Sequence, residues 1–144
     1  MQADHHTAAD PIVAKIIELL RGARPLLQAD AREFSLVYPK KPPTTGQPFP
    51  DPSQAIAHMR THLQALRTAV LAQNGGGPAA AGARQLTALT LLESDQSLEK
   101  LEQAYASSDP AAATDLRHES IRLAKQGKTT SVKAGKALGI PWPL

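Results

Sequence analysis

Two histidines four residues apart are the clearest candidate for metal chemistry in the chain. His58 and His62 fall on one face of a predicted helix, the spacing at which two imidazoles can bind one metal ion. His118, or Glu119 beside it, would supply a third ligand from a neighbouring helix, as in metal sites inside helical bundles. Histidines at this spacing are also common on solvated helix faces, and the glutamate of the zincin motif is missing. A metal-binding bundle and a pair of surface histidines therefore both remain open.

Positive charge gathers near the C-terminus, although the formal net charge is only +3. Within 117–136 a single acid, Glu119, stands among six basic residues: Arg117, Arg122, Lys125, Lys128, Lys133 and Lys136. Such side chains contact phosphates without reading bases, which predicts binding to nucleic acid or another polyanion. No aromatic residue is interleaved among them, so we do not expect stacking on single strands. The alternative is a solvated face that keeps an alanine-rich bundle soluble.

The segment TTSVKAGKALGIP (129–141) resembles the first helix and turn of a helix-turn-helix. That motif reads DNA with a second helix, and only three residues follow Pro141. We therefore expect a helix that ends in a glycine cap with a hydrophobic contact after it. The alternative is that the chain is a fragment of a longer helix-turn-helix protein.

The sequence carries no recognisable catalytic motif. It has no cysteine, which excludes disulfides, thiolate nucleophiles and cysteine-ligated zinc. Gly127-Lys128-Thr129 resembles the end of a phosphate-binding loop, but Arg122 stands where that motif requires glycine. The acids are scattered singly. We therefore predict a non-enzymatic protein without a cofactor.

The composition predicts an all-α fold. Apolar residues make up 42% of the chain, mostly alanine and leucine, and β-branched residues are scarce. The length of 144 residues fits one domain with a real core. We predict a small helical bundle of four to six helices in a single domain at 10–144. A flexible polar tail would precede it at 1–9, and a proline-rich strap would cross it at 38–50.

A helical hairpin at 51–108 is predicted to form the centre of this bundle, with a turn at NGGGP (74–78). On its first arm, apolar residues recur at spacings of three and four, which is typical of a helix packed along another: Ile56, Met59, Leu63, Leu66 and Val70. On the second arm Leu86, Leu89 and Leu92 define one apolar face, and the apolar side changes near Glu93. We predict this arm to be the most central helix, with 10–35 and 110–139 packed on different flanks.

Proline, glycine and aspartate predict where the helices begin and end. Asp-Pro at 10–11, 51–52 and 109–110 predicts three capped helix starts. Pro25 would end or kink the first helix, with a second short helix after it. Gly127 would cap the helix after Pro110, and a short last helix would follow. Trp142, the only tryptophan, is predicted to pin the C-terminal tail onto the bundle.

These observations predict a helical protein-interaction module: an adaptor, a chaperone-like protein or a regulatory protein. The first contact we expect is self-association, because an alanine and leucine seam suits a helical partner. Nucleic acid is the alternative partner. We expect no membrane partner, because no apolar run approaches the length of about 20 residues that a spanning helix needs. The polar N-terminus lacks the pattern of a secretory signal, so a bacterial cytoplasmic protein is the default expectation.

Overall fold

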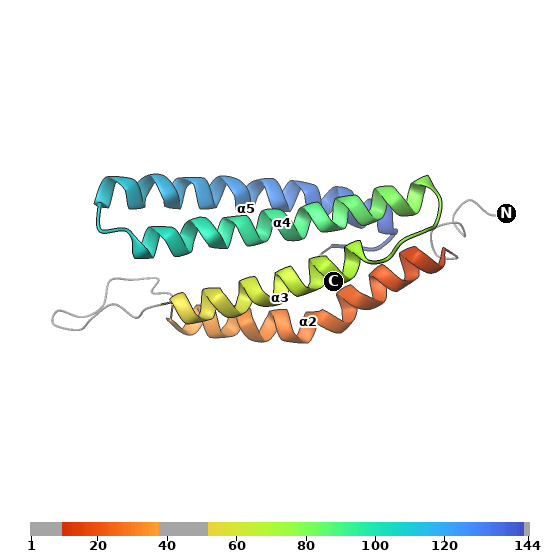
Figure 1. Ribbon diagram of the computed structural model, residues 1–144, viewed down its shortest axis with the longest axis horizontal. Helices are drawn as coiled ribbons and strands as arrows, with labels where there is room; N and C mark the ends of the chain where they lie inside the picture. Colours follow the sequence, from red (N-terminus) through yellow and green to blue (C-terminus); the bar gives the residue numbers. More distant parts are fainter. Residues whose placement is uncertain (1–9, 38–51, 143–144) are drawn as a thin grey trace.

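A computed structural model describes residues 10–37 and 52–142, and these residues form four helices without a strand (Figure 1). The all-α prediction is therefore confirmed. The helices are α2 (Pro11–Val37), α3 (Ser53–Leu71), α4 (Pro78–Ala106) and α5 (Pro110–Leu138). The predicted tail at 1–9 and strap at 38–50 lie outside the described residues. None of the four helices is both long enough and apolar enough to cross a membrane.

The helix starts follow the Asp-Pro signals where the structure describes them. The Asp10 carboxylate accepts hydrogen bonds from the Ile12 and Val13 amides at 2.8 and 3.4 Å, and Asp109 accepts one from the Ala111 amide at 3.1 Å. Both aspartates thus satisfy amides that have no partner inside the helix. Asp51 lies outside the described residues.

The turn between α3 and α4 depends on glycine. Gly75 and Gly76 have φ angles of +93° and +73°, a region that residues with a Cβ rarely adopt. The chain therefore reverses direction here, and α3 and α4 form the predicted antiparallel hairpin.

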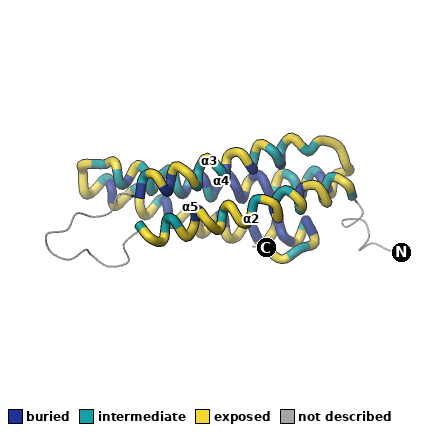
Figure 2. Tube along the Cα trace, turned by 90° about the horizontal axis from the view of Figure 1, so that it is seen from below, coloured by how far each residue is buried: buried dark blue, intermediate teal, exposed yellow. Residues whose placement is uncertain are grey.

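Helix α4 is the most central of the four, as predicted. It packs against α3 and, most extensively, against α5, and it also touches α2. Helix α2 packs mainly on α3. In Figure 1, α5 and α2 accordingly lie on opposite flanks of the α3–α4 hairpin. The view turned by 90° places α2 and α5 over the same face of the hairpin, so the two helices flank that face from opposite edges (Figure 2).

The aliphatic core joins α2, α3 and α4, and Leu138 at the end of α5 completes it. Helix α2 buries Val13, Ile16 and Leu20, and all of the predicted α3 stripe is buried except Met59, which is half-buried. Burial of such side chains is the main favourable term in folding. The core residues that these two helices supply are Val13, Ile16, Leu20, Ile56, Leu63, Leu66 and Val70.

The α4–α5 interface is built from small and hydroxylated residues. Ser97 and Ser120 bond reciprocally: each hydroxyl donates to the other residue's backbone carbonyl, at 2.8 and 2.7 Å. Such bonds require the two helix backbones to lie close together, which small residues permit. The other small residues buried on these helices include Ala80, Ala83, Thr87, Ala104, Ala113, Gly127, Thr130, Ser131 and Ala134.

The predicted apolar face on the first half of α4 is wrong. Leu89 is 43% exposed, whereas Thr87 and Thr90 are buried. Their hydroxyls donate to the carbonyls of Ala83 and Leu86 at 2.8 and 2.9 Å, so burial leaves these groups satisfied. At these buried positions of α4, small size matters more than hydrophobicity because a neighbouring helix lies close.

Two predicted helix boundaries are also wrong. Pro25 lies inside α2, which bends along its length, in agreement with the predicted kink, and continues to Val37 (Figure 1). The separate short helix predicted after Pro25 is therefore wrong. Gly127 lies inside α5 and caps nothing, because the helix continues to Leu138. Four residues after Gly127 are buried, and their burial stabilises the continuation of the helix. They are Thr130, Ser131, Ala134 and Leu138.

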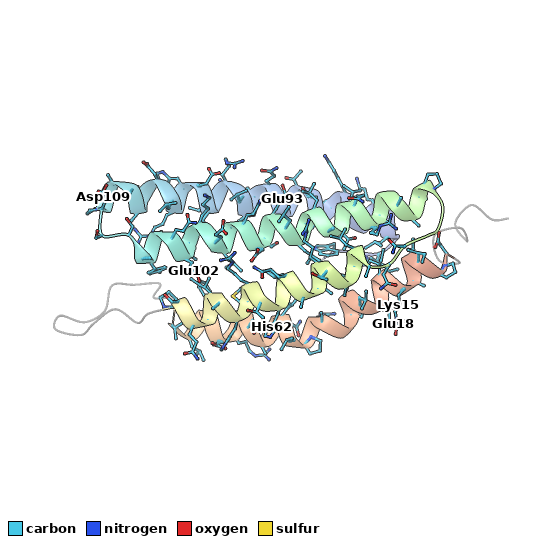
Figure 3. All side chains as sticks on the ribbon, viewed as in Figure 1. Lys15, Glu18, His62, Glu93, Glu102 and Asp109 are labelled. Atoms are coloured by element: carbon cyan, nitrogen blue, oxygen red, sulfur yellow. The ribbon has the colours of Figure 1, made fainter. Side chains whose placement is uncertain are left out.

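Glu93 is the most unfavourably placed side chain of α4. It is 2% exposed and lies between α4 and α5 (Figure 3), and neither carboxylate oxygen has a hydrogen-bond partner among the described residues. A buried polar group without a partner costs free energy.

We therefore expect Glu93→Met, which keeps the length of the side chain, to raise the free energy of unfolding by about 1–3 kcal/mol. Urea denaturation followed by circular dichroism measures this. The exposed Glu18→Met serves as control and should change stability by no more than about 0.5 kcal/mol. A loss of stability in Glu93→Met would contradict the conclusion that the missing hydrogen bonds of the buried Glu93 destabilise the fold.

Candidate functional site

A groove runs between α2 and α5 across the α3–α4 hairpin. Helices α2 and α5 pack on the hairpin but hardly contact each other within the described residues, so the bundle stays open along the seam between them. Two hollows of about 300 and 330 Å³ lie in it and share Leu27, Leu63 and Ser94. We call the continuous feature the α2–α5 groove, and its two parts the first and second hollows.

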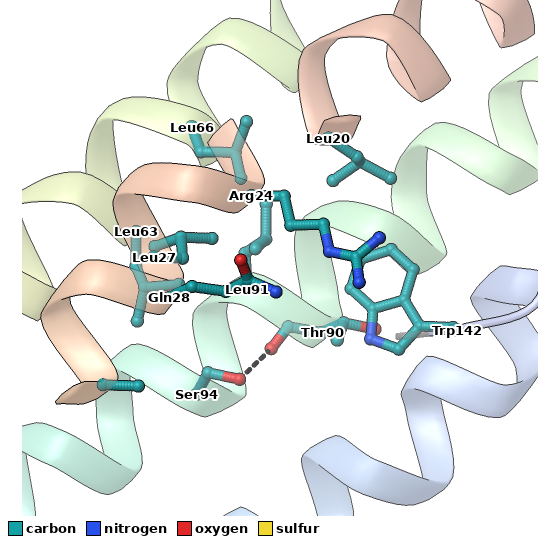
Figure 4. Close-up of a pocket in the computed structure, with 11 residues that line it drawn as sticks. Leu20, Arg24, Leu27, Gln28, Leu63, Leu66, Thr90, Leu91, Ser94 and Trp142 are labelled. Carbon is teal, nitrogen blue, oxygen red and sulfur yellow. Dashed lines mark hydrogen bonds between the residues drawn. The ribbon is translucent and has the colours of Figure 1, made fainter. Parts of the chain in front are cut away.

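The first hollow has mainly apolar walls and one cationic side chain. Helices α2, α3 and α4 supply the apolar surface, and Trp142 closes one side. The apolar lining residues of these helices are Leu20, Leu27, Ala31, Leu63, Leu66 and Leu91. Arg24 and Gln28 stand on the α2 wall (Figure 4). The Ser94 hydroxyl donates to the Thr90 carbonyl at 3.0 Å, so it is already used within α4.

The second hollow continues the groove toward α5. Met59, Leu98 and Ala124 add apolar surface, and Asp30 and Ser97 add polar atoms. Ala124 is exposed on α5, so this helix contributes a wall that a larger side chain would obstruct. Lys128 lies one turn after Ala124 and is also exposed, which places a cation at this border of the groove.

The C-terminal tail forms the wall that contains Trp142. Gly139 ends α5 with φ +74°, and the Ile140 amide donates to the Gly135 carbonyl at 3.0 Å. The expected glycine cap, with an apolar residue after it, is therefore confirmed. Trp142 packs partly buried against the core, as predicted. A Cβ on Gly135 would lie 2.9 Å from the Ile140 carbonyl oxygen and 3.1 Å from the Trp142 Cβ.

The two histidines of α3 face acids of α2. His62 Nδ1 lies 2.6 Å from an oxygen of the buried Asp30, and His58 Nδ1 lies 3.1 Å from a Glu33 oxygen on the exposed surface. His118 is exposed on α5. No three histidine, cysteine or acidic side chains converge on a possible metal position in 10–37 and 52–142. The structure therefore brings His58 and His62 to α2 carboxylates and brings no third ligand to them.

Sequence reasoning missed an ionic cluster centred on Arg60. This guanidinium joins α3 to three acids of α4: Asp95 at 2.9 Å, Glu102 at 3.0 Å and Glu99 at 3.2 Å. The hydrogen bond that Arg60 donates to Asp95 is the main cause that raises the pKa of Arg60. Figure 3 shows Glu102 on the side of α4 that faces α3. The helical spacing of the three acids on one face was the available signal.

The six predicted basic residues all lie exposed on α5 and occupy its solvent side. The Arg122 guanidinium already binds residues of its own helix: it donates to Glu119 through Nε at 3.0 Å and to Gln126 at 3.1 Å. This pairing lowers the pKa of Glu119 and raises that of Arg122, mainly through their hydrogen bond. The Arg117 guanidinium lies over the Tyr105 ring, with its Cζ atom 5.7 Å from the ring centroid.

The four lysines of this face have no ion pair with any described residue. They are Lys125, Lys128, Lys133 and Lys136, and they lie within about 17 Å along the helix at 1.5 Å per residue. Their charge is therefore available to an anionic partner.

Comparison with known proteins assigns no family. The chain matches no protein-family model, and neither a curated protein nor a solved structure matches it significantly. The groove and the basic face of α5 must therefore be weighed on their own chemistry.

The Trp142 wall can be tested by changing Gly135. We expect Gly135→Ala to displace the tail, because its Cβ would collide with Ile140 and Trp142. The fluorescence emission of Trp142, the only tryptophan, should then move to longer wavelength as the indole gains contact with water.

Gly127→Ala is the matched control in the same helix. Its Cβ would meet the Glu93 Cβ at 3.5 Å, an ordinary contact, so the emission should stay unchanged. Alanine in a helix interior should also add about 0.5–1 kcal/mol of stability. An unchanged emission in both variants would show that Trp142 is not held against Gly135.

Proposed function

We propose that this protein is a non-enzymatic interaction module that receives an amphipathic helix of a protein partner in the α2–α5 groove. The observation that carries the proposal is the open seam itself, where two adjoining apolar hollows lie over the α3–α4 hairpin. Helical bundles bury such surfaces with a further helix, and amphipathic helices commonly dock into grooves of this kind.

The charges at the groove favour a partner helix with acidic residues beside its apolar stripe. Arg24 stands on the α2 side and Lys128 borders the α5 side, and neither has an ion pair among the described residues. The acid in the groove, Asp30, lies against His62. Complementary charge of this kind steers a partner and fixes its orientation.

The groove can be tested with a blocking variant and a site-specific crosslinker. Ala124→Glu places a carboxylate in the second hollow, and we expect it to abolish capture of the partner. Thr129→Glu adds the same charge on the exposed surface of α5, outside the residues that line the groove, and should leave capture intact. Both variants should keep the helical circular dichroism of the parent protein.

A photo-crosslinking amino acid at Gln28 identifies what occupies the groove. We expect the crosslinked peptide to be a helical segment with an apolar stripe and neighbouring acids. A crosslink to a second copy, with a dimeric mass by light scattering that Ala124→Glu abolishes, would make self-association the interaction. Equal capture by Ala124→Glu and Thr129→Glu would overturn the proposal.

A second candidate function is binding to nucleic acid or another polyanion through α5. The observation that favours it is the set of four lysines without ion pairs on one exposed helix face. Arg117 and Arg122 add charge at the other end, although Arg122 is shared with Glu119. Such a surface would bind phosphates without sequence preference.

We expect fluorescence anisotropy at low salt to detect binding to a 20-base-pair DNA duplex if this second function holds. Replacing Lys125, Lys133 and Lys136 with glutamine should reduce the slope of log affinity against log salt by about 3, close to one unit for each lost phosphate contact. The control replaces the exposed Lys15, Arg21 and Arg32 with glutamine and changes the net charge equally. No binding by the parent protein, or the same loss in both variants, would exclude the lysine face.

A further inference from the structure

The first hollow has the features of a small-ligand pocket. Its volume of about 300 Å³ is at the lower limit of the range in which small-molecule pockets usually fall, about 300–1,000 Å³. Leucines from three helices and the Trp142 indole supply a mostly apolar lining. Such a lining favours a hydrocarbon group over water.

Arg24 gives this pocket a charge. Its guanidinium makes no ion pair or side-chain hydrogen bond with the described residues, and its side chain reaches across the pocket in the direction of Trp142 (Figure 4). No aspartate or glutamate within 10–37 and 52–142 lines the first hollow. The pocket therefore has one uncompensated cation beside a hydrocarbon-like interior.

The polar groups around Arg24 do not offset its charge. The hydroxyls of Thr90 and Ser94 donate to carbonyls of their own helix at 2.9 and 3.0 Å. Gln28, one turn after Arg24, carries no charge and adds amide atoms at the same wall. A ligand anion would thus find a guanidinium donor without a competing carboxylate.

The walls of the pocket are largely in place before a ligand arrives. Leu20, Leu63, Leu66 and Leu91 belong to the buried core, so their positions are fixed by packing. Trp142 is held by the cap of α5, through the Ile140 amide and the close approach to Gly135. In a preformed pocket, little of the binding free energy is lost to ordering side chains.

We propose that the first hollow binds a small amphipathic carboxylate. Its aliphatic chain would lie against the leucines and Trp142, and its carboxylate would pair with Arg24. Arginine suits this role because its planar guanidinium donates two parallel hydrogen bonds to a carboxylate. The proposal goes beyond a protein-interaction function and needs no protein partner. Because the first hollow is part of the α2–α5 groove, a docked helix and the carboxylate would compete for it.

Three probes with the same eight-carbon chain separate charge from hydrophobicity: octanoate, octanol and octylammonium. Titration calorimetry gives the affinities, and the emission of Trp142 reports occupancy of the pocket, because no other tryptophan contributes. We expect octanoate to bind about tenfold or more tightly than octanol, as a hydrogen bond to a charged group contributes about 1.5–3 kcal/mol. Octylammonium should bind most weakly.

Two arginine variants assign the selectivity to one residue. Arg24→Gln should lower octanoate affinity to that of octanol and leave octanol affinity unchanged. Arg21→Gln removes an exposed cation from the same helix that does not line the pocket, so it should retain the preference. Amide and methyl NMR shifts caused by octanoate should centre on Leu20, Leu91 and the Trp142 indole.

Each contrary result overturns the proposal. Absence of octanoate binding, equal affinity for octanoate and octanol, or a preference that survives Arg24→Gln would each be incompatible with it. The same holds for saturable binding whose NMR shifts lie away from the first hollow. None of these outcomes bears on capture of a helix by the groove, which Ala124→Glu tests separately.

Discussion

The close approach of α4 and α5 is the constraint on which the rest of the structure depends. Ser97 and Ser120 can exchange hydrogen bonds with each other's backbone only because both helices keep small residues along their contact. This contact fixes one side of α4 and leaves its other sides to α3 and α2. Most of the large aliphatic core residues consequently lie on α2 and α3, and Leu91 of α4 and Leu138 of α5 complete the core.

The two remaining interfaces are held by different chemistry. Helices α3 and α4 share the Arg60 cluster, in which one guanidinium pairs with three carboxylates across the hairpin. Helices α2 and α3 share two histidine–acid contacts, one of them at the buried Asp30. Burying a carboxylate without a partner costs free energy, so pairing with Asp30 gives His62 a structural role. The imidazole spacing that suggested a metal site therefore has an explanation within the hairpin and its flank.

Sequence patterns predicted the elements whose signals are local or strongly periodic. The Asp-Pro starts, the glycine turn, the α3 stripe and the glycine cap before Ile140 each depend on a few neighbouring residues, and the structure confirms those that it describes. The errors occurred where a distant helix decided the outcome. Packing against the neighbouring helices covers Thr87 and leaves Leu89 exposed, and Gly127 lies within a helix because residues beyond it are buried. Neither fact is encoded in local spacing.

The candidate sites divide in the same way. The basic face of α5 was visible in the sequence, since exposure of lysines on one helix needs no tertiary information. The α2–α5 groove was not, because its walls come from all four helices and from the C-terminal tail. Arg24 belongs to a helix that seemed to end near Pro25, and Trp142 seemed only to anchor a tail. Arg24 and Trp142 can line the same pocket because α2 continues through Pro25 and because Gly135 lacks a Cβ, which lets the tail lie close to α5. A glycine in one helix and a bend in another thus create the one pocket wall that combines a free guanidinium with an indole among the described residues.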